Sequence, residues 1–195
     1  PLYRGNIAGT GYSSVDQITA DNVNDLEIAW TYSLRNDAAE TPRDPNSQVT
    51  PIVVDGVMYV SNGWSVVYAL DAVTGEEIWT YDPEVDRSYI RLACCGPAHN
   101  RGVAVYEGKV FVGTFDGRLV AIDANTGEEV WDVDTWIPAG LGRFNITGAP
   151  RAAAGKVYIG QGSGETGHRR GYVTAYDADN GEVAWRFFLV PGDPS

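Results

Sequence analysis

The sequence predicts an all-β protein built from copies of one four-stranded antiparallel sheet. A phrase of the form Ala-x-Asp-x-x-(Thr/Asn)-Gly, with Trp four residues after the glycine, occurs three times. Short runs of β-branched and aromatic residues alternate with dipeptides typical of hairpin turns. The 23 glycines and 10 prolines gather between these runs, which indicates many tight turns. These three observations favour sheets over helices.

The repeated phrase marks the end of each unit. Its three copies cover residues 69–79, 121–131 and 175–185, and their tryptophans are 52 and 54 residues apart. A fainter echo, Leu26 to Trp30, ends 49 residues before Trp79 and keeps only an apolar strand with its tryptophan. Near-equal spacing of about 50 residues indicates internal repeats. We therefore expect a leading segment with one strand over residues 1–30, followed by three repeats.

Within each repeat, an apolar run split by a turn dipeptide predicts a β-hairpin. The runs cover residues 51–60, 103–113 and 152–160, with turns expected at Asp55-Gly56, Glu107-Gly108 and Gly155-Lys156. The Asp of the repeated phrase predicts a second turn, because its carboxylate can accept hydrogen bonds from backbone N–H groups two residues on. The glycine of the phrase tolerates positive φ there. Each repeat is thus predicted to be a four-stranded antiparallel sheet.

Four-stranded repeats of this length are typical of β-propeller blades. The alanine and tryptophan of the phrase fit a propeller, because an indole on an outer strand can fill a slot on the neighbouring blade that only a small residue leaves open. The alternative is that each tryptophan is ordinary core of its own sheet. A closed propeller needs about 4 to 8 blades. We therefore expect the chain to be the front part of a longer polypeptide, or to be completed by further chains.

Charge and hydropathy argue against two classes of partner. The 14 Lys and Arg residues against 26 Asp and Glu residues give a formal net charge of -12. Clustered basic residues are needed to neutralise phosphates, so we expect no nucleic acid partner. No apolar run reaches the ~18 residues of a membrane-spanning helix, so we expect no transmembrane segment.

Two adjacent cysteines, Cys94 and Cys95, lie between the first and second repeats. A bond between neighbouring cysteines demands a distorted peptide, and such strain persists mainly at ligand sites. A vicinal disulfide would form a compact apolar ring suited to lying flat on a planar ligand. The alternative is a pair of free thiols packed as small hydrophobic groups. The spacing alone does not decide between them.

A glycine-rich stretch, Gly160 to Gly167, follows a predicted strand of the third repeat and contains Glu165. Its glycines would let backbone N–H groups approach a ligand, and the carboxylate is a candidate ligand for a hard cation. The stretch lacks the Gly-Lys-Ser/Thr ending of a P-loop. The alternative is an ordinary glycine-rich turn.

Three further motifs, taken with the tryptophan phrase, resemble one enzyme family. They are Cys94-Cys95 with Asn100-Arg101-Gly102, Ile146-Thr-Gly-Ala-Pro150, and Gly162-Ser-Gly-Glu165 followed by residues 170–176. Together they resemble the pyrroloquinoline quinone (PQQ) dependent alcohol dehydrogenases of the methanol and ethanol dehydrogenase type, over residues 9–195. The resemblance implies an eight-bladed propeller with PQQ near its axis, bound to calcium or a lanthanide. Residues 1–195 would be the N-terminal part, about three blades, of this single PQQ-binding domain.

The resemblance also implies roles for individual residues. Cys94 and Cys95 match a vicinal disulfide that covers one face of PQQ. Arg101 and Thr147 match positions that bond the polar edge of the cofactor. The remaining matches are Gly162, Ser163 and Gly164 in the loop beside the PQQ carboxylates, Glu165 as a metal ligand, and Gln48 at a polar contact where many relatives have glutamate. Two intervals, from Cys95 to Arg101 and from Thr166 to Arg170, each look one residue longer than usual.

The implied activity is oxidation of a primary or secondary alcohol, with electrons passed to a cytochrome or a quinone. The family's catalytic aspartate lies beyond Ser195, so no catalytic residue is expected within this chain and we expect the chain alone to be inactive. The runner-up is a PQQ-dependent sugar or polymer-alcohol dehydrogenase. A non-catalytic propeller scaffold for outer-membrane assembly is the alternative from another class. A strained disulfide and the family's export predict a periplasmic location.

Overall fold

The computed structural model describes residues 8, 10–34, 46–88, 98–137, 145–161 and 171–192. Three four-stranded antiparallel sheets, called blades 1, 2 and 3, follow one another along the chain. Blade 1 contains β2 (Ile52–Val54), β3 (Val57–Ser61), β4 (Val67–Asp71) and β5 (Glu77–Tyr81). Blade 2 contains β7 (Ala104–Tyr106), β8 (Lys109–Gly113), β9 (Arg118–Asp123) and β10 (Glu129–Asp134). Blade 3 contains β11 (Arg151–Ala153), β12 (Lys156–Gly160), β13 (Tyr172–Asp177) and β14 (Val183–Phe188).

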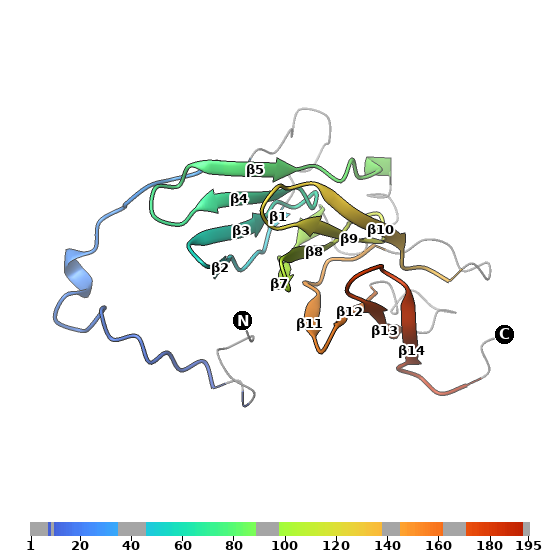
Figure 1. Ribbon diagram of the computed structural model, residues 1–195. Helices are drawn as coiled ribbons and strands as arrows, with labels where there is room; N and C mark the ends of the chain where they lie inside the picture. Colours follow the sequence, from blue (N-terminus) through green and yellow to red (C-terminus); the bar gives the residue numbers. More distant parts are fainter. Residues whose placement is uncertain are drawn as a thin grey trace.

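Two small elements lie outside the blades. β1 (Asn46–Ser47) pairs in parallel with β6 (His99–Asn100), and a 3₁₀ turn, η2 (Val23–Asp25), lies in the leading segment. In Figure 1 the part of this segment around η2 lies apart from the sheets. Its large apolar side chains, such as Tyr12 and Ile28, are exposed.

The blades are arranged around their first strands. Within each blade the strands are hydrogen-bonded in chain order, so β2, β7 and β11 form one edge and β5, β10 and β14 the other. β7 contacts both β2 and β11, and the three sheets fan out from this side (Figure 1). Radial packing of four-stranded sheets is the β-propeller arrangement, which confirms the predicted fold.

The first hairpin of each blade closes with the same kind of turn. Both turn residues have positive φ, with 50° and 81° at Asp55-Gly56 and 46° and 72° at Glu107-Gly108. Such pairs form type I′ turns, whose twist matches that of the flanking strands. In blade 3 the turn lies at Ala154-Gly155, so the prediction of Gly155-Lys156 is wrong by one residue. Glycine holds the second turn position in all three blades, and Lys156 therefore opens β12.

The second predicted turn is confirmed. Asp71 Oδ1 accepts hydrogen bonds from the backbone N–H groups of Val73 and Thr74, at 2.8 and 2.7 Å. Asp123 makes the equivalent pair of bonds in blade 2. These backbone donors, Thr74 N–H before Val73 N–H, hold the pKa of Asp71 below its ordinary value. The carboxylates therefore form part of the turn itself.

The core lies between the blades. Blade 2 is buried on both faces, and successive residues of its strands alternate between the two neighbours. Phe111 and Leu119 pack in the cluster shared with blade 3, whereas Val110, Val112 and Val120 pack in the cluster shared with blade 1. Burial on both faces explains why β8 and β9 read as nearly unbroken apolar runs.

The tryptophans of blades 1 and 2 dock on the following blade, which confirms the inter-blade interpretation. Trp79 Nε1 donates to Ala124 O at 3.0 Å. A Cβ placed on Gly127, whose φ is +75°, would lie 2.8 Å from the same indole. The small residue beneath the ring is thus the glycine of the next blade. The repeated alanine, here Ala69, instead pairs with Trp79 across its own sheet.

The leading segment occupies the place of an outer strand beside blade 1. Trp30 Nε1 donates to Ala72 O at 3.3 Å, and the indole lies against Gly75. Tyr32 donates its hydroxyl hydrogen bond to Glu77 of blade 1. Among the described residues nothing pairs with residues 26–30 in a sheet, so the strand expected there stays a prediction.

Candidate cofactor site

Three of the predicted site residues, Gln48, Arg101 and Thr147, fall within the described part of the chain. The other six lie outside the described residues: Cys94, Cys95, Gly162, Ser163, Gly164 and Glu165. The disulfide and the metal ligand therefore stay predictions.

The structure brings the three described residues together. Each lies a few residues before the first strand of its blade, where the backbone segments run side by side. Gln48 N–H donates to Asn100 O at 3.2 Å, next to Arg101. Arg101 N–H in turn donates to Thr147 O at 3.1 Å. One residue from each blade thus contributes to a continuous arc at the inner edge of the sheets.

The side chain of Arg101, like its backbone N–H, bonds Thr147. Its Nη1 donates to Thr147 Oγ1 at 2.7 Å and to Thr147 O at 3.3 Å. A guanidinium carries five N–H donors in a planar fork. The Thr147 contacts use only Nη1, and the Arg101 side chain is exposed. Its outer edge is therefore placed to bind an anionic ligand.

A pocket of about 420 Å³ opens beside this arc. The described residues that line it include Arg101, Thr147, Arg151, Gln161 and residues of β12 and β13. No carboxylate is among the described lining residues, although the chain has an excess of acidic residues. The described part of the lining is thus basic within an acidic chain. Gln161, one of the lining residues, directly precedes the predicted loop of residues 162–165 in the sequence.

The lining suits the implied cofactor. PQQ is a planar quinone with three carboxylates, so it needs cationic donors at its edge and flat or apolar walls at its faces. Arg101 and Arg151 supply two guanidinium groups, and Ile159 and Val173 supply apolar surface. A volume of this size lies within the range of about 300–1,000 Å³ that is typical of small-molecule sites.

Sequence reasoning assigned no role in this site to three residues that shape it. Arg151 and Gln161 line the pocket. Arg151 directly follows the Ile146–Pro150 motif and Gln161 lies within the glycine-rich stretch, but neither was named as a ligand. Gly102 follows Arg101 with φ +117°, and a Cβ there would lie 3.2 Å from Thr50 O. The Asn100-Arg101-Gly102 sequence could have indicated this conformation, since a glycine directly after a candidate ligand often marks a backbone position with positive φ or little space for a side chain.

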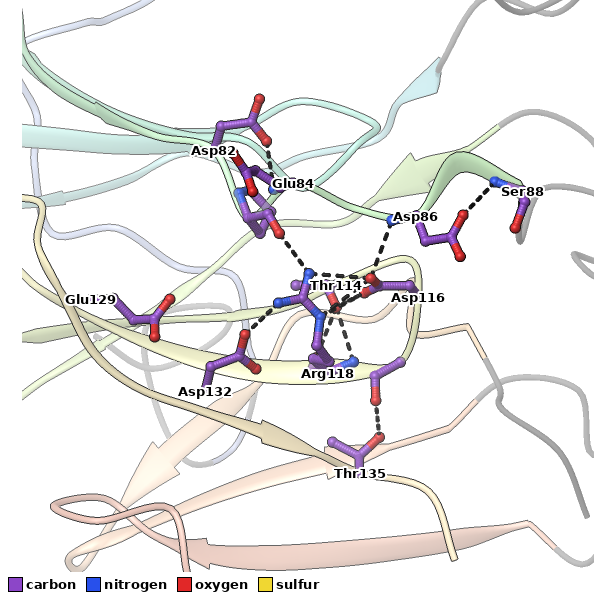
Figure 2. Close-up of polar contacts among 12 residues, drawn as sticks. Asp82, Glu84, Asp86, Ser88, Thr114, Asp116, Arg118, Glu129, Asp132 and Thr135 are labelled. Carbon is purple, nitrogen blue, oxygen red and sulfur yellow. Dashed lines mark hydrogen bonds and ion pairs between the residues drawn. The ribbon is translucent and has the colours of Figure 1, made fainter. Parts of the chain in front are cut away.

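A second polar cluster, centred on Arg118, lies at the junction of blades 1 and 2 (Figure 2). Arg118 Nε contacts both carboxylate oxygens of Asp116 at 3.2 Å, and its Nη1 pairs with Asp132. Its Nη2 donates to Pro83 O at 2.6 Å, and Asp86 N–H donates to Asp116. Burial raises the pKa of Asp132, and the Arg118 charge opposes that shift. The cluster fastens blade 1 to blade 2, and none of its members lines the pocket.

The comparisons with known proteins agree with this geometry. Residues 1–195 match the family model described as the glucose/ethanol/alcohol dehydrogenase β-propeller domain, named for PQQ. The chain belongs to this family. The quinohemoprotein alcohol dehydrogenase of Comamonas testosteroni is 54% identical over 195 residues, which is 100% of this chain and 26% of that relative. The 1-butanol dehydrogenase (cytochrome c) of Thauera butanivorans is 53% identical over 190 residues, with 96% and 26% covered.

Solved structures show the same relationship for this member of the PQQ family. The crystal structure of the Comamonas testosteroni enzyme superposes with a TM-score of 0.88 at 53% identity, covering 100% of this chain and 28% of that one. A europium-containing methanol dehydrogenase superposes with a TM-score of 0.81 at 36% identity, covering 96% and 31%. The chain thus spans about a quarter of the length of the curated relatives it matches.

Two features are absent from the residues that the structure describes. No helix among these residues is long and apolar enough to cross a membrane. Nor do the same ranges bring three or more His, Cys, Asp or Glu side chains together in a way that could hold a metal ion. The predicted metal ligand, Glu165, lies outside them.

Proposed function

We propose that the complete protein is a PQQ-dependent alcohol dehydrogenase that passes electrons to a cytochrome or a quinone. The observation that carries this proposal is the basic pocket at the arc of Gln48, Arg101 and Thr147. Relatives that are 53–54% identical are named as alcohol dehydrogenases, one of them linked to cytochrome c, which supports the same conclusion.

The residues of the pocket would hold the cofactor by its edge. Arg101 would pair with a PQQ carboxylate while Thr147 keeps its guanidinium in place. Gln48 would offer a neutral amide where many relatives have glutamate. Bound PQQ supplies the two-electron acceptor for alcohol oxidation. Arg151, another residue that lines the pocket, adds a second positive charge that favours an anionic ligand.

The residues outside the described ranges would complete the site. Gly162, Ser163 and Gly164 would present backbone N–H groups to the cofactor, and Glu165 would bind calcium or a lanthanide. Glu165 lies four residues beyond Gln161 of the pocket wall. A disulfide between Cys94 and Cys95 would cover one face of the ring. An oxidising compartment is needed to keep such a bond, so we place the protein in the periplasm.

The proposal is tested on the full-length protein. We expect reconstitution with PQQ and calcium to give dye-linked oxidation of primary or secondary alcohols. Arg101→Met should weaken PQQ binding at least 100-fold, because a charge-assisted pair is lost. Lys109→Met, which removes a cation distant from the pocket, should leave PQQ binding unchanged. A folded full-length protein that binds no PQQ and oxidises no alcohol overturns the proposal.

Two further results separate the alternatives. Oxidation of sugars or polymeric alcohols in place of simple alcohols would favour the runner-up within the family. Mass spectrometry under non-reducing conditions addresses the scaffold alternative. A deficit of about two daltons in the Cys94-Cys95 peptide is the mass of the two hydrogens lost on disulfide formation and supports a cofactor site. Two alkylatable thiols would favour a scaffold without one.

A further inference from the structure

Asn100 is a fully buried polar residue directly before Arg101. Its side-chain amide has two donor and two acceptor positions, and the structure fills all four. Oδ1 accepts from Ser61 Oγ at 2.9 Å and from Gly102 N–H at 2.8 Å. Nδ2 donates to Ser65 Oγ at 3.1 Å and to Gly113 O at 2.9 Å. The amide therefore joins blade 1, blade 2 and the backbone that carries Arg101.

The orientation of this amide is determined by two of its partners. The N–H group of Gly102 can only donate, so it must face the amide oxygen. The carbonyl of Gly113 can only accept, so it must face the amide nitrogen. A carboxylate at position 100 would instead place an oxygen against Gly113 O. Asparagine is thus the side chain that satisfies both neighbours, and an unsatisfied buried group is costly.

The backbone around Arg101 is held on both sides by this residue. The Oδ1 bond to Gly102 N–H is a local turn that spans Arg101. Asn100 O accepts the N–H of Gln48 at 3.2 Å. Because the Asn100 side chain points into the core, the next side chain, that of Arg101, points the other way, toward Thr147 and the pocket.

We propose that Asn100 is a positioning residue that aims the Arg101 guanidinium at the anionic edge of the cofactor. This inference rests on the proposed function, because the ligand of the pocket is taken to be PQQ. Asn100 itself does not line the pocket. It acts through the peptide on either side of Arg101 and through Gln48.

The test compares two buried asparagines in the full-length protein. Asn62 is 1% exposed, and its Oδ1 accepts from the backbone N–H groups of Trp64 and Val66 within blade 1. Its Nδ2 donates to Tyr68 of the same blade at 3.3 Å. Asn62 holds the turn that carries Ser65, a partner of Asn100. Asn100→Asp therefore places a buried carboxyl at the amide that bonds Gly102 N–H, and Asn62→Asp places the same group one contact further from the Arg101 backbone. Asn100→Ser, which keeps one donor and removes the longer contacts, is the second variant if Asn100→Asp does not fold.

The main readout is the PQQ dissociation constant of the apoprotein, measured by fluorescence titration. We expect Asn100→Asp to raise it at least tenfold at pH 7, with Asn62→Asp within twofold of wild type at a similar loss of Tm. As pH falls toward 5, the ratio of Asn100→Asp to wild type should shrink, because a protonated carboxyl regains one donor for Gly113 O. Equal weakening in both variants, or wild-type binding by Asn100→Asp, overturns the inference.

Hydrogen exchange in the apoprotein separates this inference from the proposed function. Peptides covering residues 99–104 should exchange at least tenfold faster in Asn100→Asp and Asn100→Ser, but not in Asn62→Asp. Unchanged exchange there overturns the positioning role whatever ligand the pocket binds. If the wild-type protein shows this local exchange pattern but does not bind PQQ, the proposed function and the cofactor part of the inference are overturned. The role of Asn100 in holding the backbone around Arg101 then still stands.

Discussion

Trp79 of blade 1 and Trp185 of blade 3 occupy equivalent positions in their own sheets but very different surroundings. Each packs on a tyrosine of the second strand of its sheet. The ring centroids are 5.9 Å apart for Trp79 and Tyr59 and 5.8 Å apart for Trp185 and Tyr158, with nearly the same interplanar angle. Yet Trp79 is 8% exposed and Trp185 is 47% exposed. The difference is the next blade, whose Gly127 lies under Trp79. No described residue plays that part for Trp185.

The comparison shows that the junction, rather than the sheet, buries the indole. A difference in exposure of this size is on the order of 100 Å² of an indole's surface, or about 2.5 kcal/mol of hydrophobic stabilisation. The neighbouring side chains of β14, including Phe187, are exposed as well. Most of the stabilisation from the motif tryptophan therefore comes from its contacts with the next blade.

The largest expected effect comes from removing the docked indole. Trp79→Ala should lower the free energy of unfolding by about 3–5 kcal/mol, as for other large buried aromatic residues. In the 195-residue chain, Trp185→Ala should cost about 1–2 kcal/mol, because no described residue covers its indole. Urea unfolding of the chain measures both. Equal losses would show that each sheet buries its own tryptophan.

The Arg118 cluster is expected to give the next largest effect at the same junction. Arg118→Met leaves Asp116, which is buried, without its ion pair, and should cost about 3 kcal/mol. The matched control is Lys109→Met, which breaks the pair with Asp179, an exposed residue of blade 3. That change should cost under ~1 kcal/mol. Comparable losses in urea unfolding would contradict a special role for the buried cluster.

The glycine slot can be tested against a glycine of the same conformation. Gly127→Ala should cost about 2–3 kcal/mol, because its Cβ collides with Trp79 in addition to the strain of positive φ. Gly108→Ala has φ +72° but open space around the new Cβ, and should cost about 1 kcal/mol. Equal urea midpoints for the two variants would show that the collision with the indole contributes nothing to the cost of Gly127→Ala.

The smallest expected effect is a dependence of stability on pH. Backbone N–H groups, first that of Thr126 and then that of Asn125, hold the pKa of Asp123 below its ordinary value. A carboxylate with a lowered folded pKa contributes stability above its unfolded pKa of about 4, and loses it as pH falls through the folded pKa. Asp123→Asn keeps an acceptor oxygen but cannot titrate. Its urea midpoint should therefore fall less steeply below pH 4 than that of the wild type, and parallel curves would contradict this account.

Much of the fold could be predicted because its signals are local. The Asp of each repeated phrase bonds the next few backbone groups, and the glycine takes positive φ, whatever the neighbouring blade does. The error at Gly155-Lys156 was one residue, because Ala154 adopts a φ that alanine rarely takes. Propensity alone does not forecast such a residue.

The site was predictable only as a set of matched residues. Gln48, Arg101 and Thr147 could be named from motifs, but their meeting depends on three blades placing the starts of their first strands side by side. Arg151 and Gln161 lie next to or within sequence motifs, but nothing in those motifs marks them as pocket residues. The four-way bonding of Asn100 depends on Ser61 and Gly113 from different blades. These contacts join residues far apart along the chain, so no local pattern encodes them.

The amino-acid sequence by itself determined the strands, the turns, the repeat length and the family, because period-two apolar runs and turn residues act over a few positions. The tertiary structure alone decided which indole is buried, which peptide holds Arg101 and where a basic pocket opens in an acidic chain. The physical reason is that burial and hydrogen-bond satisfaction belong to surfaces brought together between blades, and those surfaces exist only once the sheets have packed.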